Sequence, residues 1–352
     1  MRQALTYDDI QLVPAYSNII SRKNISLVTN VTRNYKLKIP IIAAPMDTVC
    51  DSKMAVALMK LGGIGCIHRF MSIEEQIAET LKVKIACTQE MNTWWGDLYD
   101  DYHAPNKFIP IMVAVGATGD YIERTNELIK AGAKIILIDV AHGHHENVKI
   151  AIQNIKAISS EVDVIAGNIA TPGAAIDLCD WGADALRVGV GGGSLCTTRI
   201  KTGFGVPNVT CLQDIIAVSK VPVIADGGIR TSGDITKALA LGADTIMLGS
   251  LIAGTEEAPG SIIDKAGALY KRYRGAASLE TKMAHGQEAR NVEGESTVIP
   301  YKGGVKYIVT DLLDGVRSAL SYGGATDLSN FHPQIVQVTN SGLNEARPHL
   351  IK

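Results

Sequence analysis

Short runs of apolar residues with the length of β-strands recur along the chain. Each run is continuously apolar rather than alternating with polar residues, which is typical of parallel strands buried on both faces. The eight runs are 39–44, 62–67, 108–115, 133–140, 162–168, 184–190, 221–228 and 244–250. Between most of them apolar residues recur with helical spacing, as over 51–61, 121–131, 146–158 and 233–240. The pattern therefore predicts strands that alternate with helices.

A glycine motif marks three of the expected helix-to-strand connections. It reads AGAK at 131–134, WGAD at 181–184 and LGAD at 241–244. In each, glycine follows the end of a helix and the next strand starts two residues later, as αβ loops commonly do. Eight strands with helices between them favour an α/β fold, a closed (β/α)8 TIM barrel. A doubly wound open sheet is the alternative.

Two segments fall outside the repeat. Residues 1–38 precede the first strand, and we expect them to cap the bottom of the barrel. Residues 255–305 follow the eighth strand and are rich in Gly, Lys, Arg and Glu. A connection this long in a compact domain is usually functional, so we predict a flap and phosphate-loop region there. Since no linker marks a second domain, residues 1–352 are expected to form one.

Composition narrows the class of protein. The chain has 352 residues, 46% of them hydrophobic, and a formal net charge of −2, which does not favour binding to nucleic acid. Its six cysteines show no CxxC spacing, so a reducing cytoplasm is expected rather than a disulfide framework. The N-terminus places acids where a signal peptide would be apolar, and no run approaches the roughly 20 apolar residues of a membrane helix.

The loop beyond the sixth strand carries the strongest candidate for chemistry. It reads GVGGGSLCTTRIKTGFG over 189–205, and its glycines allow a ligand to approach the backbone closely. Cys196 lies in this loop near Arg199 and Lys201, and nearby cations favour the reactive thiolate. The alternative is a buried structural thiol, the role we expect for the other five cysteines.

The turns after the seventh and eighth strands form a second candidate site. They read ADGG over 225–228 and LGS over 248–250, and barrels often bind phosphate between these two loops. Asp226 is placed to accept hydrogen bonds from two sugar hydroxyls, and a helix cap is its alternative role.

A third cluster, IDVAHGHH over 138–145, ends the fourth strand. Asp139 is a candidate cofactor contact, and the three histidines raise the question of a metal. No carboxylate spacing completes a metal site, so we favour solvated histidines. Asn168, at the end of the fifth strand, is expected to point its amide into the same bowl.

Taken in order, these segments resemble the IMP dehydrogenase/GMP reductase family over nearly the whole chain. The resemblance implies that a cysteine thiolate attacks C2 of a purine nucleotide and that hydride passes between C2 and a nicotinamide. The matching segments are TYDDIQLVPAYS, APMDTV, GGIGCIHR, DVAHGH, AGNIAT, GGGSLCTTRIKTG, IADGGIRTSGDI, GSLIAGTEEAPG, YRGAAS, PYKGGV and SALSYGGA.

The resemblance assigns roles to individual residues of this chain. Cys196 is the implied nucleophile. The implied nucleotide contacts are Ser194, Asn168, Asp226, Gly227, Gly228, Gly249, Ser250, Tyr273 and Gly275. The implied cofactor contacts are Asp139, Val140, Ala141, Val190, Gly191, Ala289 and Arg290. The loop that carries a potassium site in dehydrogenases matches Gly191, Gly193 and Cys196.

Two features favour the reductase branch of the family. Dehydrogenases hydrolyse the covalent intermediate with an Arg–Tyr pair on a long flap, and most insert a pair of CBS domains. Here residues 279–299 hold no Arg–Tyr dipeptide, and 87–107 is too short for CBS domains. In reductases a threonine and a flap glutamate handle the proton for departing ammonia, and Thr198 and Glu293 match them. The resemblance thus implies an NADPH-dependent conversion of GMP to IMP and ammonia.

Other features favour a dehydrogenase that oxidises IMP to XMP with NAD. Arg69 stands where reductases usually have lysine, and CTTRI is dehydrogenase-like. Glu293 occurs in both branches, and Arg290 is a candidate base for activating water. A non-catalytic purine-nucleotide-binding regulator is a third reading. The family also implies a homotetramer, while NADPH against NADH stays open.

Overall fold

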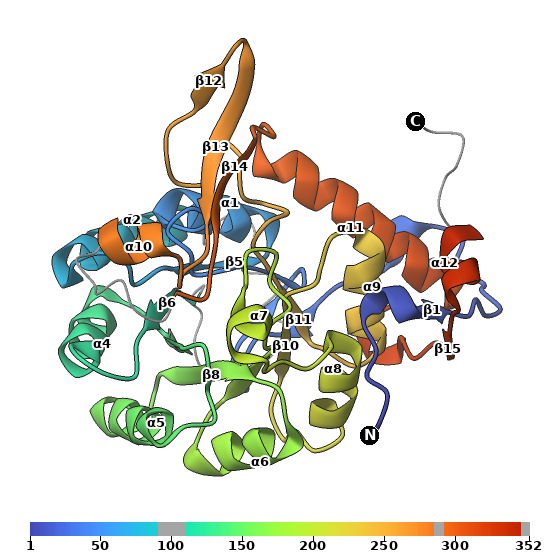
Figure 1. Ribbon diagram of the computed structural model, residues 1–352, viewed down its shortest axis with the longest axis horizontal. Helices are drawn as coiled ribbons and strands as arrows, with labels where there is room; N and C mark the ends of the chain where they lie inside the picture. The colour runs from blue at the N-terminus through green and yellow to red at the C-terminus, as the bar shows by residue number, and fades with distance from the viewer. Residues whose placement is uncertain (91–109, 285–291, 346–352) are drawn as a thin grey trace.

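The core of the computed structural model is a closed barrel of eight parallel strands (Figure 1). The structure describes residues 1–90, 110–284 and 292–345. Around the barrel the strands are β4 (Ile41–Ala43), β5 (Ile64–Ile67), β6 (Met112–Val115), β7 (Ile135–Asp139), β8 (Asp163–Ile169), β9 (Ala185–Val188), β10 (Val223–Asp226) and β11 (Thr245–Leu248). The ring closes where β11 pairs with β4. The predicted TIM barrel is confirmed, and the open sheet is excluded.

Helices surround the barrel (Figure 1). They are α1 (Ser52–Leu61), α2 (Ile73–Glu90), α4 (Tyr121–Ala131), α5 (Glu146–Ile158), α6 (Pro172–Trp181), α8 (Asn208–Ile216), α9 (Ser232–Ala240) and α11 (Val305–Tyr322). The predicted stop signals work as expected, since Gly132 and Gly182 end α4 and α6 in the left-handed region, at φ values of 115° and 107°. None of the described helices combines the length and apolarity needed to cross a membrane.

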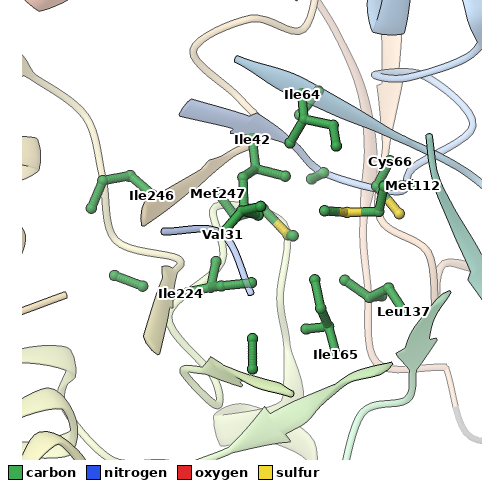
Figure 2. Close-up of a cluster of buried hydrophobic side chains, with 14 of the residues drawn as sticks. Val31, Ile42, Ile64, Cys66, Met112, Leu137, Ile165, Ile224, Ile246 and Met247 are labelled. Atoms are coloured by element: carbon green, nitrogen blue, oxygen red, sulfur yellow. The ribbon is translucent and has the colours of Figure 1, made fainter. Parts of the chain in front are cut away.

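The barrel interior is filled by apolar side chains (Figure 2). Ile42, Cys66, Met112, Leu137, Ile165 and Ile224 come from six different strands, and all are fully buried. A barrel packed in this way is not a channel, so chemistry is confined to its rim.

Residues 1–38, which precede the barrel, pack in two separate regions of the molecule. A hairpin of β2 (Thr29–Asn30) and β3 (Lys36–Leu37) lies at the N-terminal end of the barrel, where the Thr32 hydroxyl donates to Asp163 over 2.5 Å. Residues nearer the N-terminus include η1 (Tyr7–Asp9) and β1 (Ile10–Leu12), and the carbonyl of Tyr7 accepts from Lys237 of α9. β1 pairs with β15 (Ile335–Gln337) near the C-terminus.

An antiparallel sheet follows β11 and projects from the barrel (Figure 1). It consists of β12 (Ile263–Lys265), β13 (Ala268–Arg274) and β14 (Ser296–Pro300), with α10 (Leu279–Ala284) between the last two strands. The register pairs Tyr273 with Thr297. This sheet holds Tyr273 beside the rim of the barrel. The shorter elements are η2 (Arg22–Asn24), α7 (Thr198–Thr202), η4 (Leu328–Asn330) and α12 (Asn340–Glu345).

Candidate active site

A cavity of about 420 Å³ lies at the C-terminal ends of the barrel strands. Every predicted site residue that the structure describes lines it, from the β7 end through the 189–205 loop to the projecting sheet. Ala289 and Arg290, two predicted cofactor contacts, lie outside the described residues. The structure therefore brings together predicted site residues that are up to 154 positions apart, from Asp139 to Glu293.

Backbone hydrogen bonds join the loop that carries Cys196 to residues 293–295 at the end of the flap. The amide of Thr197 donates to the carbonyl of Glu293 over 3.0 Å, and the amide of Glu295 donates to the carbonyl of Leu195 over 3.0 Å. A turn closed by Cys196 N–H and the Gly193 carbonyl at 3.1 Å presents the thiol to the cavity. The position of Glu293 is thus fixed by backbone bonds to the nucleophile loop.

Three side chains form a directed chain of hydrogen bonds. The Cys196 thiol donates to Thr198 Oγ1 over 3.2 Å, and the Thr198 hydroxyl donates to Glu293 Oε2 over 2.7 Å. A proton leaving the sulfur can therefore reach a carboxylate through one hydroxyl. The side chain of Arg199 instead packs against Gly191 and Gly205, so the group that contacts the thiol is Thr198 rather than the arginine that sequence reasoning placed near it.

Arg187 is a site residue that the sequence analysis missed. It lies in β9, 8% exposed, and its guanidinium contacts Asp139 Oδ1 at 2.5 Å and Asp226 Oδ2 at 2.9 Å. Burial acts to lower the pKa of Arg187, but the two carboxylates outweigh it and raise that pKa, so the charge is permanent. Arg69 Nε approaches the other oxygen of Asp139 at 3.6 Å. The signal was present as one charged residue within the apolar run ALRV.

Asp226 is anchored by two side-chain donors and does not cap a helix. Its Oδ2 accepts from Asn168 Nδ2 at 2.7 Å as well as from Arg187, while Thr231 caps α9. Among the described residues no donor to Oδ1 of Asp226 is present. One carboxylate oxygen is thus anchored and the other is available to the cavity.

The turns after β10 and β11 meet Ser194 and Tyr273 on one side of the cavity. The hydroxyl groups of Ser194 and Tyr273 lie 3.0 Å apart, and Gly228 and Ser250 line the same cavity. Burial raises the pKa of Tyr273, so its phenol keeps the proton it would donate. Glycine turns and neutral hydroxyl donors suit an anion such as phosphate.

Another part of the cavity lining has the features of a cofactor cleft. Val140, Ala141 and Val190 supply apolar surface next to the Asp139 carboxylate. A flat ring with a polar carboxamide fits such a wall, because its faces are apolar and its edge needs a partner. Arg69 continues the wall and stacks on Phe70, with Cζ 4.9 Å from the ring centre.

The histidines after β7 do not converge. His144 Nε2 lies 2.7 Å from Asp177 Oδ2, whereas His145 accepts from the amide of Asn147 and caps α5. Within the described ranges no group of three or more His, Cys, Asp or Glu side chains could hold a metal ion.

Gly189 is a position where a side chain cannot fit. Its φ is 138°, and an added Cβ would lie 2.0 Å from the carbonyl oxygen of Asp226. We expect Gly189→Ala to displace Asp226, lowering stability by about 2–3 kcal/mol and weakening nucleotide binding. Thermal unfolding and nucleotide titration measure the two effects. Gly173→Ala is the control, since its Cβ would meet nothing within 4 Å, and unchanged binding in Gly189→Ala would contradict the geometry.

Known proteins resemble this chain in both sequence and structure. The model of the family described as "IMP dehydrogenase / GMP reductase domain" matches residues 4–349. The chain is 38% identical to inosine-5'-monophosphate dehydrogenase of Borreliella burgdorferi, covering 99% of this chain and 97% of that protein. It is 32% identical to GMP reductase of Leishmania major, covering 99% and 97%. A crystal structure of a Cys-to-Ala variant of Trypanosoma brucei GMP reductase in complex with guanosine 5'-monophosphate has a TM-score of 0.91, 32% identity and coverage of 99% and 98%.

Proposed function

The chain belongs to the IMP dehydrogenase/GMP reductase family of purine-nucleotide oxidoreductases, and we propose that within it the protein is a GMP reductase. It would convert GMP and NADPH into IMP, ammonia and NADP⁺. The observation that carries the proposal is the chain of hydrogen bonds Cys196–Thr198–Glu293. Deamination needs a proton at the departing nitrogen, and this chain ends on a group that can store one. The solved relative from Trypanosoma brucei, crystallised with GMP, supports the same substrate.

Different residues of the site bind different parts of the nucleotide. The turns at Gly228 and Ser250, with Ser194 and Tyr273, bind the 5'-phosphate, and Asp226 Oδ1 accepts from the ribose. Binding energy from these groups holds the purine so that its C2 faces the sulfur of Cys196.

Cys196 Sγ bonds to C2, and its proton passes through Thr198 to Glu293. The relay returns a proton to the exocyclic nitrogen of this adduct, the C2–N bond breaks, and ammonia departs, which leaves a thioimidate bound to Cys196. Held beside Asp139, Val140 and Ala141, a nicotinamide would supply hydride to C2. The C–S bond then breaks and Cys196 is regenerated, so that GMP, NADPH and two protons give IMP, NADP⁺ and ammonium.

Removing the relay should slow deamination selectively. We expect Glu293→Gln or Thr198→Ala to reduce the rate of ammonia release by about 100-fold. The reverse hydride transfer, from IMP to NADP⁺, should be slowed less. Single-turnover ammonia release and nicotinamide absorbance measure the two steps. Glu295→Gln is the matched control, because it makes the same charge change on an exposed neighbour. Equal loss in both steps would contradict the proposed role.

A dehydrogenase that oxidises IMP to XMP with NAD is the second candidate. It is favoured by the identity with the Borreliella dehydrogenase and by Arg69, whose guanidinium pairs with Asp139 in the cofactor wall. Two absorbance traces of the reduced nicotinamide band separate the candidates, one with GMP and NADPH and one with IMP, NAD and potassium. A fall in the first with ammonia released supports the reductase. A rise in the second with XMP formed would overturn it and make Arg290 the residue to test as base.

Three finer assignments accompany the proposal. NADPH is preferred over NADH as the cofactor, which the ratio of kcat/KM values tests. A potassium ion would use carbonyl groups of Gly191, Gly193 and Cys196, although that of Gly193 already accepts from Cys196 N–H. The protein would work as a homotetramer in the cytoplasm, which light scattering and cell fractionation test. Nucleotide binding without turnover in both assays would indicate a non-catalytic regulator.

A further inference from the structure

Three lysine ammonium groups hold the loop after β11, residues 250–258, by its main-chain carbonyl oxygens. Lys302 Nζ donates to Ser250 O over 2.6 Å and to Leu251 O over 3.0 Å. Lys271 Nζ donates to Thr255 O over 3.1 Å, and Lys53 Nζ donates to Glu256 O over 3.0 Å. Of the three, Lys302 is bound at the end of the loop that adjoins the cavity.

Residues 249–253 form a single helical turn at that end. The amides of Ile252 and Ala253 donate to Gly249 O over 3.2 and 2.9 Å. The amides of Ser250 and Leu251 have no acceptor within the part of the chain that the structure describes. Gly249 and Ser250 line the cavity. Among the described residues, the first amides of this turn therefore have no hydrogen-bond acceptor, while the carbonyl groups of Ser250 and Leu251 accept from Lys302.

Lys302 forms no ion pair with a carboxylate among the described residues, whereas Lys53 has Glu256 Oε1 at 3.8 Å. In a trans peptide the C=O and N–H groups point in opposite directions, so a cation on the Ser250 carbonyl polarises the Leu251 N–H on the far side.

We propose that Lys302 is a positioning residue for the 5'-phosphate subsite. It fixes the 249–253 turn and supplies a positive charge behind it, without touching the nucleotide. This role rests on the proposed function, because that proposal places the phosphate at Gly249 and Ser250.

The test compares a nucleotide with the nucleoside that lacks the phosphate. Dissociation constants for GMP and guanosine are measured by titration with wild type, Lys302→Met, Lys302→Gln and Lys302→Arg. In the Met and Gln variants we expect GMP affinity to fall about tenfold, while guanosine affinity changes less than about twofold. Lys302→Gln keeps a hydrogen-bond donor and removes the charge, and Lys302→Arg should restore GMP affinity. Lys53→Met is the matched control and should leave both affinities unchanged.

Each outcome separates this role from the function on which it rests. Wild type that binds GMP and guanosine equally would contradict the phosphate subsite itself. Wild type that prefers GMP, with the same preference in Lys302→Gln, would overturn the role of Lys302 alone. Parallel loss of both affinities, without rescue by arginine, would show a purely structural role and would also overturn it.

Discussion

Cys196→Ala is expected to reduce turnover by at least about a thousandfold while nucleotide affinity stays within a few-fold of wild type. In the proposed reaction the sulfur makes the only covalent bond to the substrate, and the proposed phosphate turns and Asp226 supply the ground-state binding. Rates of NADPH oxidation with GMP and the dissociation constant of GMP check the two halves of this statement. Both candidate reactions use the same nucleophile, so this result is expected for either direction.

Cys179→Ala provides the matched control. Cys196 and Cys179 are the two cysteines that the structure leaves partly exposed, and only Cys196 lines the cavity. Cys179→Ala should keep wild-type turnover. A Cys196→Ala variant that turns over at the wild-type rate would exclude covalent catalysis by Cys196. Loss of GMP binding together with turnover would indicate instead that the substitution disturbs the 189–205 loop.

Local patterns were sufficient to predict the barrel. A strand buried on both faces must be apolar throughout, and each of the eight apolar runs became a strand, shortened where glycine turns the chain. β9 was predicted over 184–190 and ends at Val188, because Gly189 has a φ of 138°. The projecting sheet was missed, although ALYKRYR places exposed and buried residues in near alternation over β13.

Long-range partners could not be predicted from local patterns. Arg187 lies 48 residues from Asp139 and 39 from Asp226, and a lone arginine in a strand does not reveal which carboxylates face it. Glu293 was assigned to the site from family resemblance, because no local signal links it to Thr198, 95 residues earlier. Lys302 and its carbonyl partners were missed for the same reason, since hydrogen bonds to main chain leave no trace in residue identity.

Arg187→Met should be among the most destabilising single substitutions in the molecule. It leaves the Asp139 and Asp226 side chains, 12% and 19% exposed, without the cation that lies between them. Removing one partner from a buried charge cluster lowers the free energy of unfolding by about 3–5 kcal/mol. That loss corresponds to a fall in Tm on the order of 10 °C. Arg33→Met is the control, because Arg33 is 55% exposed and lies 3.7 Å from Asp184, so its loss should cost about 1 kcal/mol or less.

Arg187→Lys distinguishes lost charge pairing from lost packing, because it keeps the positive charge without the planar guanidinium. An Arg187→Lys variant no more stable than Arg187→Met would mean that the arginine acts through its volume. Arg187→Lys, which keeps a charge but reaches one carboxylate at a time, should recover part of the stability and less of the nucleotide affinity, because Asp226 needs the planar guanidinium to stay oriented toward the ribose.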